Sequence, residues 1–242
     1  MTLRISNVRK SYGDKDVLKD ISFEVAAHEF VCILGHSGCG KSTLLNLTAG
    51  YIQPDSGSIT VSGEAVTRPS RSRGVVFQDH SLFPWFKVID NIAFGPEVQG
   101  LGKTEARKVA REYLKLIGLE EYENHYPSAL SGGMKQRVGI ARALAGKPDI
   151  LLMDEPFGSL DILTRDTMRS ELLRIWLQLR TMVLFVTHSI SEAIHLADRI
   201  IVMKSGSVAG IFEVKMARPR HIQDGEFVRI LTELEGLLTS LE

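Results

Sequence analysis

Residues 30–47 read FVCILGHSGCGKSTLLNL and place three patterns one after another. Residues 30–34 are apolar and rich in β-formers, which is typical of a strand buried on both faces. Residues 35–42 fit the pattern G-x-x-x-x-G-K-[ST], and the leucine-rich residues after them begin a helix. Because strand, loop and helix follow in this order, a phosphate-binding loop is favoured over a glycine-rich turn without function.

Each part of this loop has a predicted role in binding phosphate. The glycines let backbone N–H groups close around phosphate oxygens, and the helix N-terminus adds the positive end of its dipole. Lys41 is expected to reach the β- and γ-phosphates, and Ser42 to offer its hydroxyl to Mg²⁺. Binding at His36 and Cys39 uses the backbone, so we expect their side chains to be inert. The predicted nucleotide-binding residues of the loop are Gly35, His36, Ser37, Gly38, Cys39, Gly40, Lys41, Ser42 and Thr43.

The composition is that of an ordinary globular protein. The chain has 242 residues, with 29 Lys and Arg against 29 Asp and Glu, and its net charge is +0. This balance excludes the strongly basic surface that sequence-independent binding to nucleic acid requires. Two cysteines make no disulfide framework, which favours a reducing compartment. Without a signal peptide or a run of ~18 apolar residues, the chain is expected to be neither secreted nor membrane-spanning.

Apolar runs alternate with helical patterns on both sides of the loop. Short β-rich runs at 75–77, 150–153 and 182–186 predict a largely parallel central sheet together with the strand at 30–34. Period-2 alternation at two further stretches predicts an antiparallel β-layer, at residues 3–8 and 18–25. Helical spacing marks three more stretches, at residues 106–117, 168–179 and 227–238. Residues 79–130 lack a strand pattern, so the predicted α/β domain carries an inserted helical subdomain.

Two carboxylates follow the apolar run at 150–153. Asp154 would reach Mg²⁺ directly or through water, and Glu155 would polarise an attacking water molecule. A solvated acidic turn is the alternative, and it is the more common reason for such a pair alone. With a phosphate-binding loop in the same chain, the pair predicts hydrolysis of a nucleoside triphosphate.

A second anion site is predicted where residues 130–137 read LSGGMKQR before a helix. Ser131, Gly132 and Gly133 would supply a hydroxyl, close backbone approach and a helix N-terminus. Here the sequence resembles the ATPase subunits of ATP-binding cassette (ABC) transporters, whose signature LSGGQ appears with Met134 in place of the glutamine. The resemblance implies a head-to-tail dimer, in which each ATP lies between the Lys41 loop of one subunit and the Ser131 helix of the other.

The resemblance extends from residue 3 to about residue 208 and brings in further residues. Tyr12 matches the aromatic residue that stacks on adenine, and Gln78 matches the glutamine that contacts Mg²⁺ and the attacking water. Asp161 lies in the loop that joins the two sites, and His188 matches the histidine on the γ-phosphate. Singly, each has a plainer alternative: an exposed strand-end aromatic, a solvated loop residue, a helix N-cap and a strand cap. Their order along the chain favours the functional interpretation.

The resemblance therefore implies a P-loop NTPase of the ABC ATPase fold that couples ATP hydrolysis to transport. Its implied parts are a core at about 1–78 and 148–215, a helical subdomain at about 79–147 and a C-terminal helix at about 224–240. The implied catalytic residues are Lys41, Gln78, Glu155 and His188. The implied Mg²⁺ ligands are Ser42, Gln78 and Asp154. Outside the loop, the implied ATP-binding residues are Tyr12, Gln78, Ser131, Gly132, Gly133 and Asp161.

The implied partners are other protein chains at a membrane. A second ATPase subunit and a separate membrane permease are expected, with a periplasmic or extracellular solute-binding protein acting indirectly. Residues 82–88 and 217–220 are similar to importer ATPases for nitrate, sulfonate, taurine and bicarbonate. The implied location is the cytoplasmic face of the inner membrane, as a peripheral subunit. The aromatic residues at 82–86 have two open interpretations, a core of the helical subdomain or a groove for a permease helix.

Two other classes of protein compete with this interpretation. A soluble cassette ATPase acting on nucleic acid or ribosomes would need a long coiled coil or a second cassette. The interval between Lys41 and Ser131 is too short for the coiled coil, and the chain has one cassette. A kinase that shares the phosphate-binding loop would leave residues 131–133 and His188 without a role.

Overall fold

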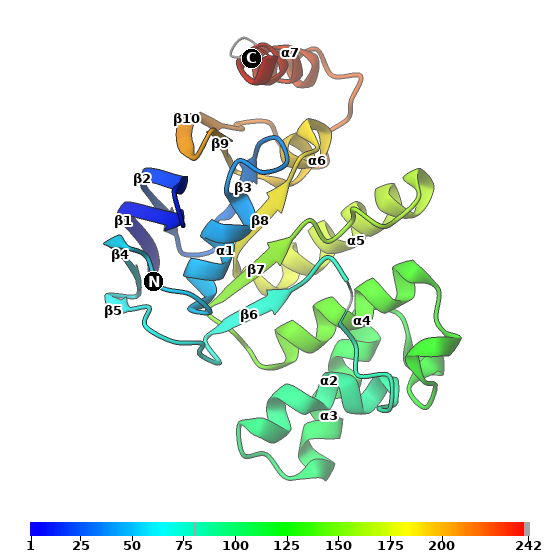
Figure 1. Cartoon of the computed structure of the whole chain (residues 1–242). Coiled ribbons are helices and arrows are strands. Elements are labelled where there is room, and N and C mark those ends of the chain that lie inside the picture. The colour runs from blue at the N-terminus through cyan, green and yellow to red at the C-terminus, as the bar shows by residue number, and fades with distance from the viewer. Residues whose placement is uncertain (80, 240–242) are drawn as a thin grey trace. The chain divides into compact units, whose positions relative to one another are not determined.

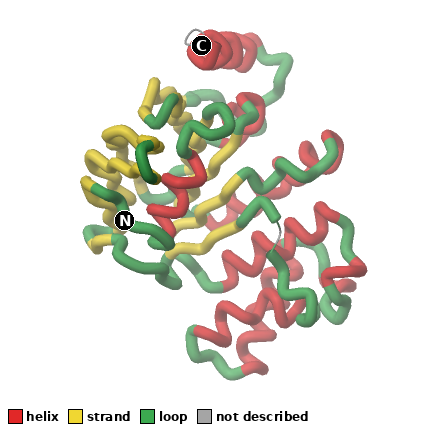
Figure 2. Tube along the Cα trace, in the orientation of Figure 1, coloured by secondary structure: helices red, strands yellow, loops and turns green. Residues whose placement is uncertain are grey.

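The computed structural model describes residues 1–79 and 81–239 (Figure 1). By its internal contacts the chain forms two compact units, Met1–Ser70 with Met182–Glu242 and Arg71–Thr181. Most strands belong to the first unit, whereas the second is mainly helical (Figure 2). Within the described residues, no helix combines the length and the hydropathy needed to cross a membrane. The subdomain boundaries expected near residues 79 and 147 stay a prediction.

An antiparallel sheet opens the first unit. It has the order β2-β1-β4-β5, with β1 (Thr2–Tyr12), β2 (Lys15–Ala26), β4 (Ser56–Val61) and β5 (Glu64–Ala65). Burial alternates along parts of β1 and β2, for example at Ile21, Phe23 and Val25, as period-2 sequence patterns predict, and register shifts interrupt the alternation elsewhere. The predicted antiparallel layer at 3–8 and 18–25 is confirmed.

The phosphate-binding loop follows a fully buried strand of the same unit. β3 (Phe30–Leu34) pairs in parallel with both β8 (Met182–Thr187) and β9 (Arg199–Lys204), and β10 (Ser207–Glu213) pairs antiparallel to β9. Helix α1 (Lys41–Ala49) contacts β8, and α6 (Ile190–Leu196) contacts β3 and β8. Neighbouring strands and packed helices thus explain why every residue of β3 is apolar.

The second unit pairs two strands and packs four helices. β6 (Arg73–Val76) lies parallel to β7 (Ile150–Asp154). The helices are α2 (Val88–Val98), α3 (Lys103–Leu116), α4 (Gly132–Ala145) and α5 (Ile162–Leu179), with 3₁₀ turns at Glu120–Tyr122 and Pro127–Ala129. Residues 79 and 81–130 contain no strand, so the absence predicted there is confirmed for the described part of that segment. His80 lies outside the described residues.

A buried arginine in the C-terminal part of the chain, Arg220, binds the C-terminal end of helix α6. Arg220 is 4% exposed, and its guanidinium donates hydrogen bonds to the backbone oxygens of Ile194, Ala197, Val214 and Met216. Burial lowers the pKa of Arg220 to about 10, so it remains charged at neutral pH. The carbonyls at a helix C-terminus lack intrahelical partners and carry partial negative charge, which suits this cation. Beyond it, α7 (Gly225–Thr239) packs its apolar face against α6.

We predict that Arg220→Met destabilises the protein, because the backbone oxygens at the end of α6 lose their donor inside the structure. The free energy of unfolding should fall by about 2 to 4 kcal/mol, as measured by urea denaturation. The control is Arg229→Met on α7, whose exposed side chain forms only surface ion pairs with Glu226 and Glu233. It should cost about 0.5 kcal/mol or less. Equal losses in the two variants would contradict the capping role of Arg220.

Candidate functional site

The loop between β3 and α1 has a backbone that requires glycine. Gly38 and Gly40 have φ angles of 81° and 105°, in the left-handed region that side chains disfavour. At Gly40 a Cβ atom would also lie 2.6 Å from a methyl group of Leu18 and 2.8 Å from the backbone oxygen of Val17. The conformation of the loop therefore requires glycine at Gly40, the second fixed glycine of the G-x-x-x-x-G-K-[ST] pattern, and favours it at Gly38.

Lys41 organises this loop from within. Its side chain is 4% exposed, and Nζ donates to the backbone oxygens of Gly35 at 2.8 Å and His36 at 2.9 Å. Helix α1 begins at Lys41 without an acidic residue in its first turn, and the side chain of Ser42 is exposed there. An ammonium group and a helix N-terminus thus meet in one loop, which is the arrangement that attracts a polyphosphate.

His188 follows the neighbouring strand of the same unit. Leu34, the last residue of β3, is paired with Thr187, the last residue of β8. The phosphate-binding loop and His188 therefore both follow the carboxyl ends of adjacent parallel strands, where open α/β sheets bind ligands. His188 is exposed, in agreement with a side chain that reaches a ligand.

Tyr12 ends strand β1 and is 52% exposed. The ammonium group of Lys10 lies 5.7 Å from the centre of its ring. An exposed aromatic ring is able to stack on a planar base, but the same exposure fits the plainer strand-end alternative. The role of Tyr12 in binding adenine stays a prediction.

The two carboxylates lie at the end of β7 in the second unit. Asp154 is the last residue of the strand, Glu155 follows it, and both are half-buried. Glu155 has a φ of 41°, an uncommon conformation for a residue with a side chain and one that is concentrated at functional sites. The turn after β7 therefore holds Glu155 in a costly conformation.

Gln78 lies close to the same turn. Strand β6 pairs Val76 with Met153 of β7, so Gln78 and Glu155 follow the ends of adjacent parallel strands. A Cβ atom built on Gly158 would be 3.2 Å from the Nε2 atom of Gln78, which shows how closely this amide approaches the turn. The structure thus brings Gln78 to the loop that follows Glu155, and the catalytic role of Gln78 stays a prediction.

The residues 131–133 open helix α4 as predicted. Ser131 is its N-cap, and its hydroxyl accepts a hydrogen bond from the N–H of Met134 at 3.3 Å. Met134, which departs from the LSGGQ signature, therefore contributes to the cap through its backbone rather than its side chain. A Cβ atom on Gly133 would lie 2.9 Å from the methyl group of Thr164, so α4 approaches the start of α5 closely.

Asp161 begins α5 beside this helix. Its carboxylate caps the helix by accepting from the N–H of Thr164 at 3.0 Å, and this hydrogen bond is the main reason for its lowered pKa. Asp161 is therefore a helix N-cap, as the plainer alternative predicted, and it is exposed. Leu160, just before it, would lie 3.3 Å from a Cβ atom on Gly132. The second unit therefore brings the Asp161 loop next to residues 131–133.

Asn91 has a structural role that the sequence patterns did not reveal. It is fully buried in α2, accepts from the backbone N–H of Phe83 and donates to the backbone oxygens of Phe83, Phe86 and Lys87. Its signal in the sequence was an amide among the apolar positions of a helix. Asn91 holds the aromatic segment in one conformation.

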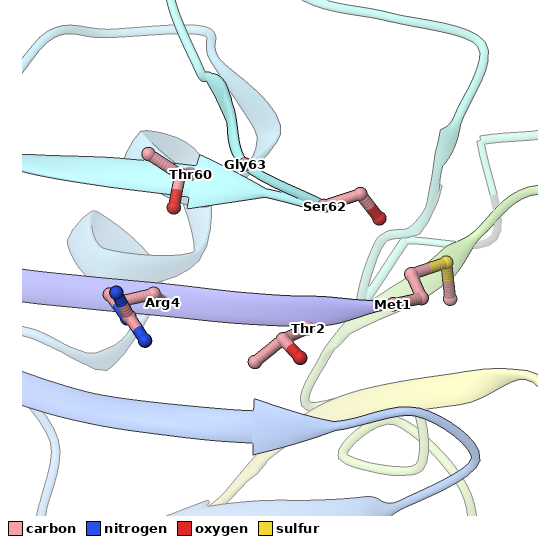
Figure 3. Close-up of a pocket in the computed structure, with 6 residues that line it drawn as sticks. All are labelled: Met1, Thr2, Arg4, Thr60, Ser62 and Gly63. Atoms are coloured by element: carbon pink, nitrogen blue, oxygen red, sulfur yellow. The ribbon is translucent and has the colours of Figure 1, made fainter.

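A shallow pocket at one end of the antiparallel sheet holds none of the predicted residues (Figure 3). Its volume is about 450 Å³, and it is lined by Met1, Thr2, Arg4, Thr60, Ser62 and Gly63. Arg4 is paired with Glu24 at 2.6 Å. The lining has no carboxylate, imidazole or thiol, so its serine and threonine hydroxyls have no side-chain base in the lining to activate them.

Comparisons with known proteins identify the family. The family model described as ABC transporter matches residues 18–158. An uncharacterised ABC transporter ATP-binding protein of Methanocaldococcus jannaschii is 42% identical over 242 residues, covering 98% of this chain and 91% of its own. The nitrate import ATP-binding protein of Synechococcus elongatus is 44% identical, covering 91% and 84%. The taurine import ATP-binding protein of Shigella sonnei is 47% identical, covering 84% and 80%.

Solved structures agree with these relatives. A dimeric ATP-binding cassette in a post-hydrolysis state, bound to ADP and Pi, has a TM-score of 0.77 and 33% identity, covering 89% of this chain and 100% of its own. CbiO1 of Clostridium perfringens, part of an ABC transporter complex, has a TM-score of 0.82 and 29% identity, covering 96% and 94%. The predicted fold and the predicted family are thus both confirmed. The chain belongs to the ABC transporter family, whose ATP-binding subunits hydrolyse ATP to power transport.

Proposed function

We propose that this chain is the ATP-hydrolysing subunit of an importer for a small anion such as nitrate, sulfonate, taurine or bicarbonate. Relatives named for nitrate, bicarbonate and taurine import support the solute class. One observation carries the proposal. Two helices of this chain, α1 at Lys41 and α4 at Gly132, have N-termini that are suited to binding phosphate. The relatives named for nitrate, bicarbonate and taurine import favour transport over the soluble alternative.

Mg²⁺ fits the chemistry of the predicted ligands. Among the described residues, no three His, Cys, Asp or Glu side chains form a group that could hold a metal ion. Mg²⁺ does not need such a group, because one or two carboxylates, together with waters and substrate phosphates, usually hold it. Asp154 would be the carboxylate ligand, and Ser42 and Gln78 would be the further protein ligands. The ion would neutralise charge on the β- and γ-phosphates during hydrolysis.

The catalytic roles follow from the chemistry of each side chain. Lys41 and the α1 N-terminus would bind the triphosphate, whose γ-phosphate is then attacked by water. Glu155 would orient and polarise that water, and Gln78 would contact it from the neighbouring strand end. His188 would contact the γ-phosphate. The variants described below test the roles of Lys41, Glu155 and His188.

A second copy of the chain, or a close paralogue, would complete each site. Ser131 and Asp161 are exposed, although each already caps a helix. Next to Asp161, Ile162 is 75% exposed and Leu163 is 80% exposed. Adjacent exposed apolar residues of this size indicate an interface. A dimeric solved relative supports a pair of subunits. In a head-to-tail pair, this surface would meet the other subunit's phosphate-binding loop.

The aromatic segment 82–86 is the proposed contact with the membrane permease. Phe83 and Phe86 pack on each other and on Phe94, so part of the segment is the local core that one interpretation predicted. Trp85 is different, because it is 69% exposed. An exposed tryptophan is a favoured anchor at protein interfaces. Through this contact the chain would lie peripherally on the cytoplasmic face of the inner membrane, and the solute-binding protein would act only through the permease.

Glu155→Gln should separate ATP binding from hydrolysis. The amide keeps the size of the side chain but cannot act as a base, so turnover should fall by about 100-fold or more. Mg·ATP binding should persist and closed dimers should accumulate, as measured by phosphate release and by size-exclusion chromatography with light scattering. Glu121→Gln, at an exposed position, is the matched control. Hydrolysis near the wild-type rate in Glu155→Gln would exclude the assigned role of Glu155.

Mixing two inactive variants should restore activity if each site is shared between subunits. Lys41→Ala should weaken binding of the triphosphate, and Ser131→Ala should remove the signature hydroxyl from the opposite face. In a mixed dimer, one of the two sites receives both wild-type halves, so ATP hydrolysis should recover to up to about half the wild-type rate. A mixture no more active than its components, with dimers present, would contradict the shared-site arrangement.

Trp85→Ala should weaken assembly with the permease without unfolding the chain. Because the ring is mostly exposed, the melting temperature and ATP binding should change little, whereas co-purification with the permease or the coupling of hydrolysis to transport should fall. Ile222→Ala removes an apolar side chain of 54% exposure outside the segment and should assemble normally. If Trp85→Ala instead unfolds, the ring is part of the core. Normal assembly and transport would remove Trp85 from the interface.

A further inference from the structure

Three hydrogen bonds join Thr187, Ser189 and Glu192 in a closed ring, and His188 lies between the first two of these residues in the sequence. The hydroxyl of Thr187 donates to Oε2 of Glu192 at 2.6 Å. The same hydroxyl oxygen accepts from the backbone N–H of Ser189 at 3.0 Å. The hydroxyl of Ser189 in turn accepts from the backbone N–H of Glu192 at 3.3 Å. The residues on both sides of His188 are therefore tied to one carboxylate-bearing helical turn.

The members of this ring differ sharply in burial. Thr187 is 2% exposed and Glu192 is 5% exposed, whereas His188 between them is exposed. A buried carboxylate is costly unless it receives hydrogen bonds, and O–H donors to carboxylates form short, strong bonds. The hydrogen bond from the hydroxyl of Thr187 therefore stabilises the buried carboxylate of Glu192. The ring fixes the backbone of residue 188 while its imidazole faces outward.

Both ends of the ring belong to well-anchored elements. Thr187 ends strand β8, whose register with β3 places it beside Leu34, just before the phosphate-binding loop. Ser189 caps helix α6, and the other end of α6 is held by Arg220 and by Arg218, whose Nη2 donates to the backbone oxygen of Leu196 at 2.6 Å. A group held by such a network has little freedom to change its position.

We propose that Thr187 and Glu192 are positioning residues that hold His188 in the place required for ATP hydrolysis. The inference rests on the proposed role of His188 at the γ-phosphate and adds the side chains through which the fold sets that role. Neither residue needs to touch the nucleotide. Small displacements of a group that contacts a reacting phosphate cost rate, because catalysis depends on its orientation.

The test measures single-turnover hydrolysis of Mg·ATP by the full chain. At each of the two positions, a variant that breaks the ring is compared with a conservative one. Thr187→Val and Glu192→Leu break the ring, whereas Thr187→Ser and Glu192→Gln keep its hydroxyl donor and its acceptor oxygen. We expect the ring-breaking variants to lose about tenfold or more in rate with nearly unchanged ATP affinity, and the conservative variants to recover most of the rate. Thr48→Val removes another fully buried threonine hydroxyl of the same unit and should hydrolyse ATP normally.

The same variants in a His188→Ala background decide between positioning and general stability. If the ring acts through His188, Thr187→Val should have no further effect on the rate once the imidazole is gone. An independent, additive loss would overturn the proposal, as would loss of ATP binding or fold in both ring-breaking variants. A wild-type rate in His188→Ala would refute the assigned role of His188 and the inference with it. If His188→Ala hydrolyses ATP slowly and Thr187→Val hydrolyses it at the wild-type rate, the inference is refuted while the proposed role of His188 stands.

Discussion

Backbone N–H groups at helix N-termini are the feature on which the proposed chemistry depends. The first turn of any helix presents donors that no preceding carbonyl satisfies, and the helix dipole adds partial positive charge there. Helices α1 and α4 both begin without an acidic residue in the first turn, and both begin next to glycine. These two ends are suited to phosphate for the same reason, although they lie in different parts of the sequence.

The parallel strands supply the second requirement, which is that functional groups far apart in sequence emerge at the same edge. The loop after Leu34 and the segment after Thr187 follow paired strand ends in the first unit. In the second unit, Gln78 and Glu155 follow the paired ends of β6 and β7. Because parallel neighbours have their carboxyl ends at one edge, the turns that follow paired strands emerge side by side. Glu155 is one of several non-glycine residues with left-handed backbone, and it lies in the turn that follows β7.

Buried polar side chains give these turns their fixed conformations. Lys41 is bound to the carbonyls of its own loop, Asn91 to the backbone of the aromatic segment, and Glu192 to the residues around His188. These hydrogen bonds matter because a buried polar group without a partner destabilises the folded protein, whereas an apolar residue of the same size would not. The exposed side chains that they support, such as Trp85 and His188, remain accessible to partners and ligands.

The sequence by itself determined the elements and the order of the motifs. The apolar runs at 30–34, 150–153 and 182–186 became strands close to their predicted bounds, and residues 131–133 open a helix as expected. These features are readable because strand burial, glycine conformation and helix capping are local. The sequence also named the phosphate-binding loop, since its pattern needs no distant residue to be recognised.

Only the tertiary structure decided which polar residues hold the site in place. Glu192 and Arg220 look like ordinary charged residues in the sequence, yet both are buried and bonded to segments around α6. The aromatic residues at 82–86 were equally consistent with core and interface, and the packing separated exposed Trp85 from its partly buried neighbours. Burial and hydrogen-bond partners depend on residues brought together from distant parts of the chain, so no local pattern contains them.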